Sequence, residues 1–282
     1  MYSWFVLIIA LFAAPSDDLQ VSLRARSLQP GEAVLVTCTS IQSLKSLQGT
    51  VFGKTIPFYL VEGKWQGLVG IDLDAAPGEY ELRLEGTAED GRSVVLPYAF
   101  TVSSKEFPTR RLTVHEKFVS PPQEVLDRIE REAARNRRIF ATVTEARLWA
   151  GPFGLPVDGE STSSFGKRSI LNGKPRSPHS GTDFRAGEGT PIRAPNSGRV
   201  VLADDLYFSG NCVILDHGLG LYSYFAHLSG FNVKEGQRVN QGDVVGYVGA
   251  TGRVTGPHLH WTVRLPGARV DPFSLMHILS DR

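Results

Sequence analysis

Glycine and proline divide most of the chain into short apolar runs, and this constrains the fold more than any other feature. The 282 residues contain 29 glycines and 17 prolines. In the N-terminal part, the runs VSLRAR, AVLVTC, YELRLEG and VVLPYAFTV are separated by turn-forming pairs such as Pro30-Gly31, Pro77-Gly78 and Asp90-Gly91. Runs of this kind at this spacing are typical of antiparallel strands. We predict an immunoglobulin-like β-sandwich over residues 17–104.

The second half of the chain continues this β pattern behind a helical connector. Good helix formers fill the sequence from Glu124 to Arg138, which predicts a helix within a linker over residues 105–150. Beyond it, GTPIRAPNSGRVVLADD, NCVILDHG, LYSYFAHL and GDVVGYVG are short β-rich runs separated by glycines. We therefore predict a mainly β second domain over residues 151–282.

The first 16 residues have the character of a signal peptide. Their apolar run from Trp4 to Ala14 has the length of the hydrophobic region of such a peptide, and it is short for a membrane span of about 20 residues. No Lys or Arg precedes this run, so an uncleaved anchor that tethers the protein to the membrane is the alternative. Either interpretation predicts an exported protein.

Composition narrows the class of partner. Hydrophobic residues make up 41% of the chain and charged residues 21%, which is typical of a globular protein. The formal net charge of +1 gives no reason to expect nucleic acid as a partner. The two cysteines, Cys38 and Cys212, lie in separate apolar runs without the C-x-x-C spacing of a metal or redox motif, so we predict that both are free and buried.

Four histidines and one carboxylate in the second half of the chain carry chemistry. The stretch TGPHLHW contains His258 and His260, which project to the same side if this stretch is a strand. His179, Asp183 and His227 precede them. Imidazole and carboxylate suit Zn²⁺, and a catalytic zinc site typically has three protein ligands. Two of the five groups would then remain as general base or acid, although spacing alone leaves open which histidines are ligands.

His217, the Asn172-Gly173 pair and Arg176 lie near these motifs and are interpreted separately. His217 follows an apolar run and precedes a glycine turn, which favours a structural hydrogen-bonding role over catalysis. Asn172-Gly173 predicts a turn, because both residues tolerate left-handed backbone geometry. Arg176 is either part of the same turn region or a group that binds a substrate carboxylate.

The order of these motifs resembles one known family. The sequences NGKPRSPHSGTDF, YSYFAHLSG and TGPHLHW, with the glycine turns between them, are similar to the lysostaphin-type, or LytM-like, zinc metallopeptidases that cut peptide bonds in bacterial peptidoglycan. The resemblance implies an antiparallel sheet that forms a groove over a zinc ion. It further implies that His179, Asp183 and His260 are the zinc ligands and that His227 and His258 flank the metal-bound water as catalytic residues.

The function that the resemblance implies is that of an exported zinc metalloendopeptidase in the periplasm or cell envelope of a bacterium. It would hydrolyse peptide bonds in cell-wall peptidoglycan with a zinc-activated water, and the sandwich would bind wall polymer or act as a spacer. One alternative is a non-enzymatic wall-binding or hydrolase-activating module. The other is a zinc peptidase that acts on another exported peptide. Relatives that only activate other hydrolases usually lack some of the five groups, so their presence here favours an enzyme.

Overall fold

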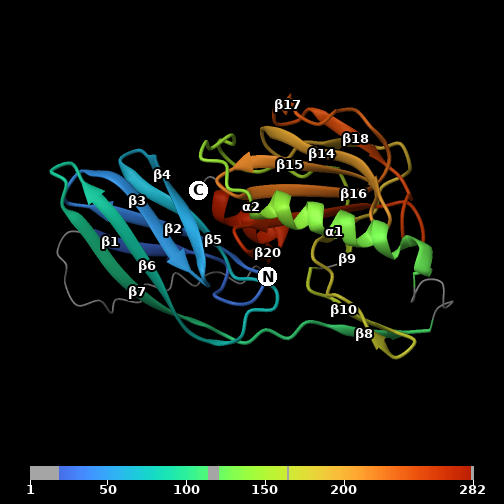
Figure 1. Cartoon of the computed structure of the whole chain (residues 1–282), viewed down its shortest axis with the longest axis horizontal. Coiled ribbons are helices and arrows are strands. Elements are labelled where there is room, and N and C mark those ends of the chain that lie inside the picture. Colours follow the sequence, from blue (N-terminus) through green and yellow to red (C-terminus); the bar gives the residue numbers. More distant parts are fainter. Residues whose placement is uncertain (1–18, 114–120, 164, 281–282) are drawn as a thin grey trace. The chain divides into compact units, whose positions relative to one another are not determined.

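The computed structural model describes residues 19–113, 121–163 and 165–280, which form two compact units (Figure 1). The first unit contains the chain up to Lys105 together with Leu265–Ser280, and the second runs from Glu106 to Arg264. The second unit is therefore inserted between two segments of the first. The boundaries 17–104, 105–150 and 151–282 remain a prediction of which parts fold independently, and the leader at residues 1–16 lies outside the described residues.

Antiparallel strands build the first unit, in the order β1-β2-β5-β4-β3-β6-β7. Alternate residues on β6, such as Leu82 and Leu84, are fully buried in its core, as expected for a sheet with one apolar face. The mainly β, sandwich-like fold predicted for this part is confirmed. The strands are β1 (Leu19–Arg24), β2 (Ala33–Ser40), β3 (Leu44–Val51), β4 (Lys54–Val61), β5 (Lys64–Gly70), β6 (Gly78–Ala88) and β7 (Ser93–Val102).

A buried carboxylate connects the C-terminal segment to the strands of the first unit. Glu32 is only 3% exposed, and its carboxylate lies 2.8 Å from Arg26 Nε and 2.9 Å from Lys105 Nζ. It also accepts a 2.7 Å hydrogen bond from the hydroxyl of Ser274 on helix α2 (Pro272–Leu279). Burial opposes ionisation of Glu32, but the hydrogen bond and charge of Arg26 outweigh it and lower the pKa. The short strand β20 (Ala268–Val270) precedes the helix.

The second unit contains nine strands of the larger sheet and a small three-stranded sheet with the strand order β11-β10-β8. The main path runs β17-β14-β15-β16-β19-β12-β9, and its pairings are antiparallel, as predicted. Its strands are β8 (Thr109–Leu112), β9 (Ser161–Ser163), β10 (Arg168–Leu171), β11 (Lys174–Pro175), β12 (Thr182–Phe184), β13 (Pro191–Arg193), β14 (Gly198–Leu206), β15 (Gly210–Gly218), β16 (Leu221–Phe231), β17 (Arg238–Val239), β18 (Val244–Val248) and β19 (Leu259–Leu265).

The predicted connector helix packs one side on this sheet (Figure 1). Helix α1 (Leu126–Ala141) follows a single 3₁₀ turn, η2 (Gln123–Val125). The helix ends three residues beyond the predicted Arg138. Ile139 and Phe140 at its end pack on the apolar cluster of the sheet. Arg135 forms a 2.7 Å ion pair with Asp204 on β14. The arginine-rich part of the helix therefore binds acidic groups of its own unit.

The prediction for the two cysteines can be checked on the described residues. Cys38 and Cys212 are both free and buried, as predicted, and burial raises the pKa of each thiol to about 12. Among the described helices, none has the length and apolar character needed to cross a membrane.

Replacing Glu32 by Ala should lower the free energy of unfolding by about 2 to 3 kcal/mol, because Arg26 and Lys105 lose their buried counter-charge. Chemical denaturation at pH 7 measures this change. Glu85→Ala is the matched control, since the Glu85–Arg83 pair is 41% and 50% exposed and its loss should leave the free energy of unfolding nearly unchanged. Equal losses in the two variants would contradict the assigned role of Glu32.

Candidate metal centre

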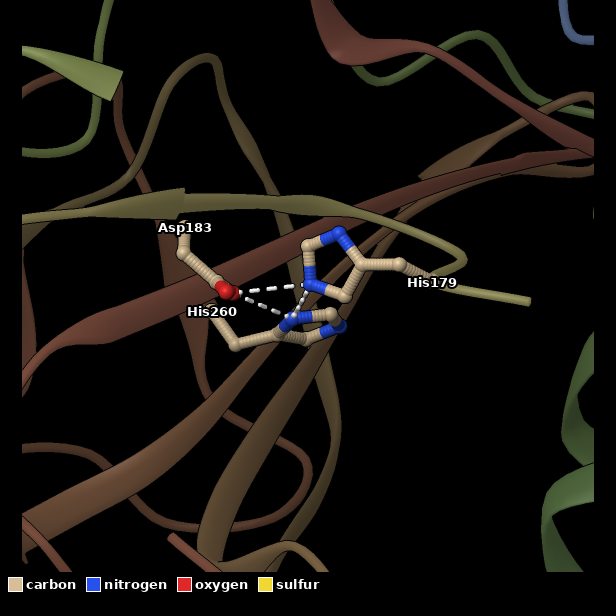
Figure 2. Close-up of side chains that lie close together, drawn as sticks. All are labelled: His179, Asp183 and His260. Atoms are coloured by element: carbon tan, nitrogen blue, oxygen red, sulfur yellow. Dashed lines mark hydrogen bonds and ion pairs between the residues drawn. The ribbon is translucent and has the colours of Figure 1, made fainter. Parts of the chain in front are cut away.

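Two paired strands place the centre of the site. Asp183 on β12 lies directly opposite His260 on β19 in an antiparallel register, so their side chains project from the same face of the sheet. His179 lies in the loop that leads from β11 to β12. Figure 2 shows the three side chains meeting, with their polar atoms turned toward one another. These are the three residues that the family resemblance implies as zinc ligands.

A glycine permits this close approach of the two strands. A Cβ atom at Gly181 would lie 2.4 Å from the carbonyl oxygen of Trp261 and 2.9 Å from the ring of His260. Both distances are shorter than van der Waals contact, so a larger residue would push β12 away from β19. Gly181 therefore sets the separation across which Asp183 and His260 meet.

The three polar atoms lie at the spacing of ligands around one metal ion. Asp183 Oδ1 is 2.9 Å from both His179 Nε2 and His260 Nδ1, and the two nitrogens are 3.0 Å apart. Zinc bonds of about 2.0–2.1 Å in tetrahedral geometry separate the ligand atoms by roughly 3.3 Å. Two imidazole nitrogens and one carboxylate oxygen are also a donor set that zinc accepts. The residues present therefore fit a zinc ion.

Neighbouring groups fix the orientation of both His179 and His260. Thr262, two residues after His260 on the same face of β19, has its hydroxyl 2.9 Å from His260 Nε2, so Nδ1 faces the other two donors. The backbone of His179 is held by two hydrogen bonds. Its N–H donates to the carbonyl of Lys167 (3.0 Å), and its carbonyl accepts from the N–H of Gly166 (2.8 Å). Such supporting contacts set the direction of a metal ligand.

His258 and His227 lie beside this group, as their predicted role requires. The ring centroids of the two are 4.9 Å apart, and that of His227 is 6.1 Å from that of His260. His258 Nε2 lies 3.9 Å from Asp183 Oδ1. Each Nδ1–H donates a 2.9 Å hydrogen bond to a backbone carbonyl, that of Gly256 for His258 and that of Thr251 for His227. In both rings Nε2 is therefore free to exchange a proton.

An irregularity in β16 aims His227 into the site. The pairing of β16 with β18 shifts register between Leu228 and Gly230, and its pairing with β15 shifts within residues 225–228. His227 has a φ of +68°, a conformation that is uncommon for a residue other than glycine. Bulges of this kind redirect a side chain out of the regular alternation of a strand. The strain at His227 is consistent with a functional position.

Burial and hydrogen bonding set the charges of the site. Burial opposes ionisation of Asp183, but the hydrogen bonds from His179 and His260 outweigh it and lower the pKa of the carboxyl well below its usual range. Burial, together with the neighbouring His260, lowers the pKa of His227 to about 4. Burial also lowers the pKa of His260. The resulting pattern, a carboxylate with neutral imidazoles, is the state in which these groups bind a divalent cation.

The remaining predicted residues lie outside the group of five. His217 is buried and hydrogen-bonded to the Ser197 carbonyl (2.7 Å) and the Ser223 hydroxyl (2.9 Å), which confirms its structural role. Asn172 and Gly173 have φ values of +49° and +78° and form the predicted turn, between β10 and β11. The N–H of Arg176 donates to the carbonyl of Ser169, and its binding to a substrate carboxylate stays a prediction.

The groups that orient the imidazole rings are not among the residues predicted from the sequence. Thr262 carries a detectable signal, because it follows His260 at the alternation of a strand and therefore shares its face. The carbonyls of Thr251 and Gly256 carry none, since every residue has a backbone carbonyl. Only the folded chain brings them to His227 and His258.

Comparison with known proteins identifies the family. Residues 177–272 match peptidase family M23. A crystal structure from Pseudomonas aeruginosa, described as a peptidase M23, is 35% identical, with a TM-score of 0.70, and the alignment covers 89% of this chain and 96% of that one. The chain belongs to peptidase family M23. The resemblance read from the motifs is thereby confirmed at the level of the family.

Two curated relatives match the second half of the chain. The DD-carboxypeptidase/endopeptidase Mpg of Neisseria meningitidis is 43% identical over 97 residues, which are 34% of this chain and 22% of that protein. The peptidoglycan DD-endopeptidase ShyA of Vibrio cholerae is 40% identical over 119 residues, which are 41% of this chain and 28% of that protein. The matched region thus spans only about a quarter of the length of either relative.

Thr262→Val should lower zinc affinity by about 10- to 100-fold, because His260 Nε2 loses the hydroxyl that fixes its ring. Competition with a chromogenic chelator measures the affinity. Thr182→Val on the paired strand is the matched control, since the buried hydroxyl of Thr182 has no hydrogen-bond partner among the described residues. Unchanged affinity in Thr262→Val, or an equal loss in both variants, would contradict the assigned role.

Proposed function

We propose that the protein is an exported zinc metalloendopeptidase that hydrolyses peptide bonds in bacterial peptidoglycan. The observation that carries this proposal is the convergence of His179, Asp183 and His260 with two further imidazoles beside them. Membership of family M23 and the names of the two curated relatives support a peptidase and a peptidoglycan substrate.

In this proposal His179 Nε2, Asp183 Oδ1 and His260 Nδ1 hold the metal. Zinc, when bound, supplies a Lewis acid that polarises the scissile carbonyl and lowers the pKa of a water to roughly 7. The carboxylate of Asp183 provides the single negative charge among the three ligands. Thr262 and the backbone of Lys167 keep the two imidazoles turned toward that charge.

His227 and His258 move protons in the proposed reaction. Their Nδ1–H groups are engaged with backbone carbonyls, so proton exchange takes place at Nε2 of each ring. One ring accepts at Nε2 the proton that the attacking water loses, and this proton can then pass to the leaving amine. The other ring, when protonated at Nε2, donates a hydrogen bond to the developing oxyanion or a proton to the leaving amine. Because water is the nucleophile, the reaction needs no covalent intermediate.

Export is part of the proposal because the substrate lies outside the cytoplasm. The apolar run from Trp4 to Ala14 supports a signal peptide or a membrane tether, although these residues are not among those that the structure describes. The sandwich unit then binds wall polymer or acts as a spacer. An exported peptide other than peptidoglycan is the second candidate substrate, and a non-enzymatic activator is the alternative outside the enzyme class.

The purified protein should contain about one zinc ion per chain and release soluble peptides from isolated peptidoglycan, with activity lost to a chelator and restored by zinc. Metal analysis and mass spectrometry of the digest test both parts, and the products identify the bond. Bound zinc without any released peptide would favour the activator. Hydrolysis that is indifferent to chelation would exclude the zinc mechanism.

The two histidines of the H-x-H pair should behave differently when replaced. His260→Ala should abolish tight zinc binding, as should replacement of His179 or Asp183. His258→Ala and His227→Ala should keep zinc largely bound and lower kcat by on the order of 10² to 10⁴-fold, because a proton-transfer group is lost. Zinc stoichiometry and single-turnover cleavage are measured on each folded variant. Zinc loss in His258→Ala with zinc retained in His260→Ala would reverse the assignment.

A further inference from the structure

The chain just after the sandwich is built into the second unit. The segment from Phe107 to Leu112 was expected within the linker, but it contains strand β8. This strand pairs in parallel with β10, with Thr109 opposite Arg168 and Leu112 opposite Leu171. The N–H of Arg168 donates a 2.8 Å hydrogen bond to the carbonyl of Pro108. We name residues 107–112 the strap.

An aromatic contact fixes the beginning of the strap. The half-buried ring of Phe107 lies edge-on to the buried ring of Phe165, with centroids 6.4 Å apart and an interplanar angle of 68°. Gly166 passes directly beneath the Phe107 ring. A Cβ atom at Gly166 would lie 2.0 Å from Phe107 Cδ1, and the φ of +82° also favours glycine. The ring of Phe107 thus covers the backbone of Gly166.

The backbone beneath that ring is the one that holds His179. Gly166 N–H donates to the carbonyl of His179 at 2.8 Å, and His179 N–H donates to the carbonyl of Lys167 at 3.0 Å. His179 Nε2 in turn lies 2.9 Å from Asp183 Oδ1. An unbroken series of contacts therefore leads from the strap through residues 165–167 to the imidazole of the site.

We propose that the strap positions His179, with Phe107 as the positioning residue, so that part of the expected linker belongs to the metal centre. His179 lies in a loop, unlike Asp183 and His260, which lie on paired strands. Its backbone direction depends on the two hydrogen bonds to residues 166 and 167. The Phe107 ring covers Gly166, and the β8 pairing holds the chain directly after Lys167, from Arg168 to Leu171. In its link to zinc, this inference rests on the proposed function.

Phe107→Ala in the full chain tests the proposal with two readouts. Zinc affinity should fall by roughly tenfold, the size expected when a support of a ligand is lost. Hydrogen exchange at the amides of Gly166 and His179 should become faster, because both donate the hydrogen bonds that the strap protects. Phe107→Leu, which retains an apolar side chain over Gly166, should lie between wild type and Phe107→Ala in both readouts.

Phe100→Ala is the matched control. Phe100 is also a half-buried ring in an edge-on contact, with Phe52 at 6.0 Å, but it lies in the first unit. The Phe100→Ala variant should lower stability without changing zinc affinity or the hydrogen-exchange rates of the Gly166 and His179 amides. Wild-type zinc affinity and exchange in Phe107→Leu and Phe107→Ala would overturn the proposal. If wild-type protein binds no zinc, the proposed function fails, and hydrogen exchange alone decides on the strap.

A double-mutant cycle separates contact from backbone strain. Gly166→Ala has two costs, the unfavourable φ and the clash with Phe107, and only the clash disappears in Phe107→Ala. The loss of zinc affinity caused by Gly166→Ala should therefore be smaller by about threefold or more in the Phe107→Ala background. Equal losses in the two backgrounds would mean that Phe107 does not act through Gly166, which would overturn the proposed route.

Discussion

The site depends on the antiparallel pairing of β12 with β19, which sets Asp183 opposite His260. A shift of either strand by one residue would turn one of these side chains to the other face of the sheet. Gly181 makes the pairing possible because any side chain there would meet the Trp261 carbonyl. The other members of the site are arranged around this fixed pair, His179 from a loop and His227 from a bulge.

The chain passes between the two units twice, each time a few residues from a group that forms or supports the site. Lys105 binds Glu32 in the first unit, and Phe107, two residues further, packs in the second. At the other crossing, β19 carries His260 in the second unit and ends at Leu265 in the first. A substitution in either connecting stretch therefore lies close in sequence to the site.

The sequence predicted those features that local pattern determines. The turn at Asn172-Gly173 follows from the freedom of glycine, and the structure has it. The pattern His258-x-His260 predicts two imidazoles on one side of a strand; His260 lies on β19, and His258 lies in an isolated bridge with Gly249 just before it, with Nε2 3.9 Å from Asp183 Oδ1. The strap could not be predicted, because a parallel pairing between residues about 60 positions apart leaves no local signal. The bulge at His227 could not be predicted either, since it depends on the registers of β16 with its two neighbouring strands.

The contacts that support the site explain why its polar residues can be identified in the sequence while their geometry cannot. His227, His258 and His179 are each oriented by backbone groups, two carbonyls and a pair of hydrogen bonds to residues 166 and 167. Backbone groups are the same at every position, so only strand register and loop path decide which ones meet a ring. A substitution far from the five polar residues, at Gly181 or at Phe107, therefore acts on the chemistry by moving backbone. The imidazoles and the carboxylate supply the chemistry, and the path of the chain decides whether they meet.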